Sequence, residues 1–148
     1  MPARLVSDRL ENQLNGLRPE VLYGVGRRMS EVRVLRVYDD PGRAPGEHRV
    51  LVDRLWPRGV RKEALDYDEW PKELTPSSAL RAWYGHDPER FGEFSGRYRG
   101  ELDQLPAAPT VARLRDLTSR QQVVLLTATR DVEHSGAAVL AAVLGTDC

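Results

Sequence analysis

Residues 122–128, QVVLLTA, decide the fold class of this chain. The segment is an unbroken apolar run of strand length, which is typical of a strand buried on both faces of a parallel sheet. Residues 127–135, TATRDVEHS, then turn the chain, and residues 136–144, GAAVLAAVL, predict a nearly all-apolar helix that packs against the sheet. This strand, turn and helix unit indicates a layered α/β domain.

Two further strands are expected upstream. Val32, Val34, Val37 and Tyr38 mark the first, because β-branched and aromatic residues favour strands. Residues 49–53, RVLVD, mark the second. Together with the helices expected later in the chain, they predict a small, single α/β domain with a mostly parallel sheet flanked by helices.

The middle of the chain predicts helices with defined ends. Ser77 or Ser78 is expected to cap a short helix that Gly85 terminates. Asp87, followed by Pro and Glu, is a typical start for the next helix. Thr110 is expected to cap a third helix, since the residue before it is proline.

Two segments lack a regular period. Residues 1–28 are broken by glycine and proline, and we interpret them as an N-terminal extension that is flexible or precedes a native start at Met29. Residues 29–148 then form the α/β domain. Residues 64–77, ALDYDEWPKELTPS, are predicted to be irregular, because their acidic and proline residues oppose a central strand.

The composition excludes several classes of protein. The 148 residues carry 22 basic and 22 acidic side chains, so a broad nucleic-acid interface is not expected. No apolar run is long enough to span a bilayer, and no membrane association is expected. The sole cysteine is Cys148, which excludes an intrachain disulfide and a cysteine metal cluster and favours a cytoplasmic setting.

The turn DRLWPRG, residues 53–59, is the first candidate site. Asp53 ends the second strand, and ligands of open α/β sheets bind beyond the carboxyl ends of the strands. Arg54 and Arg58 could hold a phosphate or carboxylate, with Trp56 as a stacking wall. Alternatively, Asp53 pairs with one of these arginines and Trp56 fills the edge of the core.

The turn TATRDVEHS is the second candidate site. A helix start beside Arg130 would suit an anion, and the hydroxyls of Thr127 and Thr129 lie nearby in the chain. Asp131 and His134, three residues apart, could act as orienting carboxylate and proton carrier. In the alternative interpretation Asp131 merely caps the following helix.

Three more residues of the middle connection are candidates for the same site. His86 follows a helix stop and could transfer a proton, although a histidine there more often caps helix carbonyls. Lys72 and Arg81 could add positive charge. Asp131 and His134 offer too few donors for a metal, so neither a metal ion nor a cofactor is expected.

Long motifs of the chain resemble the YeaO-like branch of the domain-of-unknown-function 488 family. They are VRVLRVYD, VLVDRLWPRGV, WPKELTPSSALRAWYGHDPERFGEFSGRYRGEL and VVLLTATRDVEHSGAAVL, and they span Val32 to Leu144. The resemblance implies a small cytoplasmic bacterial α/β protein and no established activity. Its matched positions include the candidates Asp53, Arg54, Trp56, Arg58, Lys72, Arg81, His86, Arg130, Asp131 and His134. Ser135 departs from the family pattern, which has Asn there.

These observations predict a pocket for a small anionic, phosphate-like or nucleotide-like ligand. Its predicted catalytic residues are His134, Asp131 and His86, and a hydrolase or transferase would fit, as would binding without turnover. A nucleic-acid-binding or partner-binding module without catalysis is the alternative. The predicted ligand-binding residues are Asp53, Arg54, Trp56, Arg58, Lys72, Arg81 and Arg130. The sequence does not indicate an oligomeric state.

Overall fold

The structure, a computed structural model, describes residues 32–145. Its centre is a three-stranded parallel sheet with the strand order β1-β3-β2. The strands are β1 (Arg33–Arg36), β2 (Glu47–Leu51) and β3 (Gln122–Thr127). The apolar run of residues 122–128 is therefore the central strand, as its pattern predicted. The interpretation of residues 1–28 as an extension lies outside the described residues.

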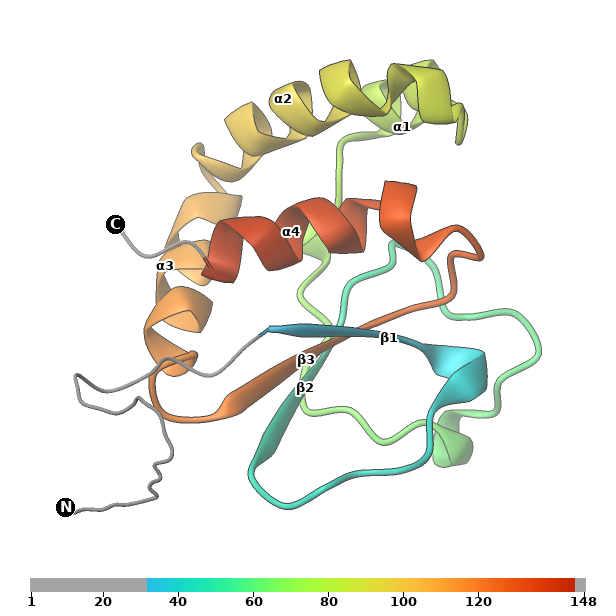
Figure 1. Ribbon diagram of the computed structural model, residues 1–148, viewed down its shortest axis with the longest axis vertical. Coiled ribbons are helices and arrows are strands. Elements are labelled where there is room, and N and C mark those ends of the chain that lie inside the picture. The colour runs from blue at the N-terminus through green and yellow to red at the C-terminus, as the bar shows by residue number, and fades with distance from the viewer. Residues whose placement is uncertain (1–31, 146–148) are drawn as a thin grey trace, which may run out of the picture.

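Four helices cover one face of the sheet, which confirms the predicted α/β architecture. They are α1 (Ser78–Tyr84), α2 (Phe91–Leu102), α3 (Ala107–Leu117) and α4 (Gly136–Gly145). Helix α4 packs against β1 and β3, and α2 packs on the side of α4 that faces away from the sheet (Figure 1). The apolar α4 is thus buried between two layers, which explains its lack of a polar face.

The other face of the sheet is covered by an irregular segment instead of helices. Val124 and Leu126 of β3 point to this face, where they belong to a core that also includes Trp56, Tyr67 and Trp70. Tyr67 and Trp70, the two aromatic residues of segment 64–77, therefore help to close the second core without a regular element. The prediction that this segment is irregular is confirmed, apart from short 3-10 turns and one bridge.

Three expected boundaries differ from the structure. Strand β2 begins and ends two residues earlier than the predicted range 49–53, and the first strand ends at Arg36, directly before a 3-10 turn (Val37–Asp39). Helix α3 begins at Ala107, so Thr110 lies inside it, and the predicted cap was wrong. Proline is tolerated in a first helical turn because no backbone donor is needed there. The Thr110 hydroxyl instead donates to Glu73, 2.7 Å away.

The helix caps around the middle connection agree better with prediction. Ser77 caps α1 by accepting a hydrogen bond from the Leu80 N–H, and Gly85 ends α1 in the left-handed conformation. Asp87 caps a 3-10 turn (Pro88–Arg90) that leads into α2. The Asp131 cap of α4 was wrong, because Ser135 Oγ accepts the Ala138 N–H at 3.1 Å.

Candidate functional site

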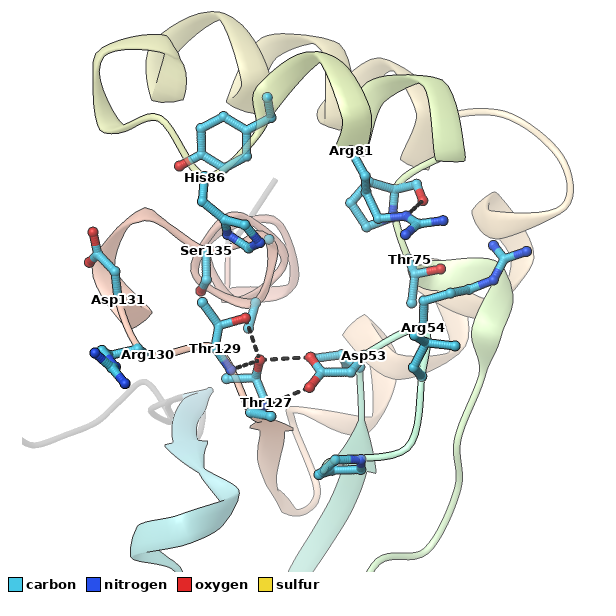
Figure 2. A pocket seen from close by; sticks show the side chains of 18 of the residues that line it. Asp53, Arg54, Thr75, Arg81, His86, Thr127, Thr129, Arg130, Asp131 and Ser135 are labelled. Carbon is cyan, nitrogen blue, oxygen red and sulfur yellow. Dashed lines mark hydrogen bonds between the residues drawn. The ribbon is translucent and has the colours of Figure 1, made fainter. Parts of the chain in front are cut away.

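A cleft opens at the carboxyl edge of the sheet, where all three parallel strands end. The chain leaving β2 and the chain leaving β3 form its floor, and the start of α4 and residues of α1 form its walls. Its volume is about 970 Å³. Figure 2 shows the cleft with Asp53 and Thr127 at its centre and His86 above them. The two turns expected to form a site, DRLWPRG and TATRDVEHS, thus face one cleft.

Four arginines line this cleft, namely Arg54, Arg58, Arg81 and Arg130. Within residues 32–145, none of the four forms an ion pair with a carboxylate. Arg81 donates to the Pro76 carbonyl and the Ser78 hydroxyl, so its side chain is partly held. Unpaired guanidiniums that line a concave surface create a positive potential there.

Most arginines elsewhere in the described chain do have carboxylate partners. Arg61 and Arg99 are unpaired, yet neither lines the cleft, and Arg115 donates to the Val143 carbonyl. The paired arginines are Arg33, Arg36, Arg43, Arg49, Arg90, Arg97, Arg113 and Arg120. The free guanidiniums are therefore concentrated at the carboxyl edge of the sheet.

Asp53 forms the floor of the cleft and is bonded to β3, not to an arginine. Its carboxylate accepts hydrogen bonds from Thr127 Oγ1 at 2.7 Å and from the Ala128 N–H at 2.6 Å. Burial raises the pKa of Asp53 above its ordinary value, although both hydrogen bonds oppose the shift. The expected pairing of Asp53 with a neighbouring arginine was wrong, and the arginines beside it stay available to a ligand.

The two histidines of the predicted site lie in different surroundings. His86 lines the cleft and has a left-handed backbone, with φ at 57°. His134 does not line it; its Nδ1 lies 2.8 Å from the Asp131 carboxylate, and its ring packs edge-on against Phe91. Asp131 itself reaches the cleft. The structure therefore pairs the acid of the site with the histidine that lies outside it.

Trp56 and Lys72 also differ in their placement. Trp56 lines the cleft, but its indole N–H donates to the Val60 carbonyl and its ring packs against Tyr67 and Trp70. Trp56 is therefore a fixed wall of the cleft and also fills the edge of the core, so both interpretations of this residue hold. Lys72 lies outside the lining, with Nζ 4.3 Å from the centre of the Trp70 ring. The structure does not bring Lys72 to the other candidates.

Several lining residues were not among the predicted site residues. Tyr38 reaches the cleft from the turn after β1, and Leu55 lies within the DRLWPRG turn. Thr75 and Ser78 add hydroxyl groups. The position of Tyr38 directly after a parallel strand was a usable signal, because the end of β1 must meet the ends of β2 and β3 at one edge.

Residues 32–145 contain neither a metal-ligand cluster nor a membrane-spanning helix. No cluster of three or more histidine, cysteine, aspartate or glutamate side chains in that range could hold a metal ion. No helix in the same range is long and apolar enough to cross a membrane.

The fold and the cleft together define a small α/β protein with an arginine-lined cleft at the carboxyl edge of its sheet. A family model described as "Inactive DUF488-N3 subclade" matches residues 31–148. The chain belongs to this family, which confirms the resemblance seen in its motifs.

The relatives of the chain are bacterial proteins of nearly the same length as the matched region. The uncharacterized protein Rv3073c of Mycobacterium tuberculosis is 50% identical over 117 residues, covering 79% of this chain and 96% of the relative. The uncharacterized protein YeaO of Escherichia coli is 38% identical over 110 residues, covering 74% and 93%. No solved structure matches the chain.

Proposed function

We propose that the cleft binds a small phosphate-type anion without turning it over. The observation that carries this proposal is the set of four cleft arginines that have no carboxylate partner within residues 32–145, namely Arg54, Arg58, Arg81 and Arg130. Guanidinium groups bind the oxygens of phosphate in a bidentate manner. The cleft also lies at the carboxyl edge of a parallel sheet, where ligands of this fold class bind.

The first turn of α4 adds to the attraction for an anion. Ser135, Gly136 and Ala137 line the cleft, so the positive end of the α4 dipole faces it. Asp53 and Asp131 oppose this charge, but the four guanidiniums outnumber these two carboxylates. A small ligand with one or two negative charges balances this excess of positive charge.

The proton-transfer groups favour binding over catalysis. A general base needs an orienting partner and access to the ligand. Among the described residues, His86 has access but no carboxylate partner, while His134 has the partner Asp131 and lies outside the lining. The family description as an inactive subclade supports the same proposal. A hydrolase or transferase has less support.

The proposal is tested by measuring the melting temperature of the protein in increasing concentrations of inorganic phosphate. Chloride at equal ionic strength is the reference. A ligand that binds only the folded state raises the melting temperature by mass action. The increase is expected to disappear in Arg54→Ala and Arg81→Ala, and the stability of Arg54→Ala without phosphate stays equal to that of the wild type or rises. Arg61→Ala is the matched control, because Arg61 is also unpaired but lies outside the cleft.

Two results would contradict the proposal. One is a melting temperature that phosphate does not change. The other is an equal loss of the phosphate effect in Arg54→Ala and Arg61→Ala, which would indicate general charge screening rather than a site.

A further inference from the structure

The cleft has an apolar lip beside its arginines. Three large hydrophobic side chains are exposed in residues 32–145, namely Tyr38 (45%), Leu55 (76%) and Leu105 (81%). Tyr38 and Leu55 both line the cleft, and we call these two residues the apolar lip. Exposed apolar side chains at a concave polar site indicate a ligand that has an apolar part.

The ring of Tyr38 is held in place before any ligand arrives. Its hydroxyl donates to the Arg58 carbonyl, 2.7 Å away, and the Arg36 guanidinium lies 4.7 Å from the ring centre. A ring fixed by two contacts loses little conformational entropy when a flat group packs against it. Trp56, in contrast, packs its ring against aromatic side chains of the core.

The charged part of the cleft lies next to this lip. Arg54 precedes Leu55 in the chain, and Figure 2 shows Arg54 and Arg81 on the same side of the cleft. The volume of about 970 Å³ is at the upper end of the range for pockets that hold drug-sized ligands. An inorganic anion alone leaves most of that space and the apolar lip unused.

We infer that the ligand is an aromatic organic phosphate of the nucleoside monophosphate type. Its ring packs against Tyr38 and Leu55, and its phosphate binds Arg54 and Arg81. This inference rests on the proposed anion-binding function and adds the class of ligand. It follows from the juxtaposition of a fixed aromatic ring, an exposed leucine and unpaired guanidiniums in one cleft.

A single nucleotide fits these observations better than a nucleic-acid strand. A strand requires a basic groove that follows several phosphates. Most described arginines outside the cleft are neutralised by carboxylates, and the whole chain has equal numbers of basic and acidic residues. Asp53 and Asp131 within the cleft also oppose a polyanion.

Isothermal titration calorimetry of the full chain tests the inference with four probes: adenosine 5′-monophosphate, ribose 5-phosphate, adenosine and inorganic phosphate. Stacking of a base on an aromatic side chain is expected to make the nucleotide bind at least about fivefold more tightly than ribose 5-phosphate. Tyr38→Ser and Leu55→Ser should each reduce this preference while phosphate binding persists. Tyr38→Phe should keep most of it, because the ring remains.

Leu105→Ser is the control for the apolar lip, since Leu105 is as exposed as Leu55 but lies outside the cleft. Equal affinities for adenosine 5′-monophosphate and ribose 5-phosphate in the wild type would overturn the inference and leave the anion site standing. Failure of all four probes to bind would overturn both proposals. Binding of a ten-nucleotide single strand much more tightly than the mononucleotide, with steep salt dependence, would also overturn the inference in favour of a nucleic-acid interface.

Discussion

The carboxylate of Asp53 accepts a hydrogen bond from the hydroxyl of Thr127 at 2.7 Å, although 74 residues separate the two in the chain. The bond joins the segments that leave two adjacent parallel strands, β2 and β3, at the floor of the cleft. It also directs the one carboxylate of the DRLWPRG turn toward β3 and away from Arg54 (Figure 2). Positive charge at the rim of the cleft is thereby left for a ligand.

Asp53→Asn is predicted to strengthen anion binding at neutral pH. Burial raises the pKa of Asp53, so the wild type gains affinity for an anion as the pH falls through that raised value. The variant is neutral at every pH, and we expect it to bind sulfate about three- to tenfold more tightly at pH 7, by removal of one nearby charge. Sulfate is the suitable probe because its charge is constant over this range.

The same substitution has a predicted effect on stability. The raised pKa means that the folded state favours the neutral carboxyl group of Asp53. The contribution of Asp53 to stability is therefore complete below its unfolded-state pKa near 3.8, and it is lost as the pH rises through its folded-state pKa. Asp53→Asn should remove this pH dependence from the free energy of unfolding. His86→Gln, which alters another residue of the cleft, is the control and should keep the Asp53 contribution. An unchanged pH profile in Asp53→Asn would contradict both predictions.

Arg49→Ala is predicted to destabilise the fold strongly. The Arg49 side chain is fully buried, and it donates to the carboxylates of Asp40 and Glu47, whose own side chains are largely buried. Removal of the cation leaves Asp40 without its ion-pair partner in the described structure and leaves Glu47 with only the half-exposed Arg33, 3.7 Å away, at an expected cost of about 3 to 5 kcal/mol in the free energy of unfolding. Urea denaturation measures this change.

Arg120→Ala provides the comparison for Arg49→Ala. Arg120 pairs with Asp116 at the surface, one helical turn apart, so its loss should cost no more than about 0.5 kcal/mol. Similar costs for the two variants would show that the buried cation contributes no more than a surface ion pair does.

Ser135→Ala is predicted to weaken α4 and the wall of the cleft that α4 provides. Ser135 Oγ accepts the Ala138 N–H, so its removal should cost about 1 kcal/mol in the free energy of unfolding. Asp131→Ala should cost less, because Asp131 makes no capping hydrogen bond in the described structure and pairs only with the partly exposed His134. If Asp131→Ala costs more than Ser135→Ala in thermal or urea unfolding, the assignment of the cap is wrong.

The sequence predicted the parts of the fold that depend on local pattern. The apolar run of residues 122–128, the Ser77 cap and the Gly85 stop each carry a local signal, and each is present in the structure. The position of α4 against the sheet follows from its apolar surface. The two turns that line the cleft were predictable because the carboxyl ends of parallel strands meet at one edge.

Competing contacts, some local and one between distant segments, decided the remaining features. Ser135 and not Asp131 caps α4, and the Asp131 carboxylate bonds to His134. The Thr110 hydroxyl donates a hydrogen bond to Glu73, which lies 37 residues away in the chain. Lys72 does not line the cleft, because its side chain lies over the Trp70 ring. The Thr110 contact depends on how separate segments pack, so no local pattern encodes it. The Asp131–His134 and Lys72–Trp70 contacts join residues at most three positions apart, and the sequence pattern does not rank them above the roles predicted for Asp131 and Lys72.

The most direct test of an anion site is the calorimetric titration of inorganic phosphate into the wild type and two double variants. The first double variant, Arg54→Ala/Arg81→Ala, removes from the cleft two guanidiniums that have no carboxylate partner within residues 32–145. The second, Arg61→Ala/Arg99→Ala, removes two such guanidiniums from outside the cleft. The account predicts one phosphate per chain in the wild type and in the second variant, and at least a tenfold loss of affinity in the first. Equal affinity in all three proteins, or no binding to the wild type, would contradict it.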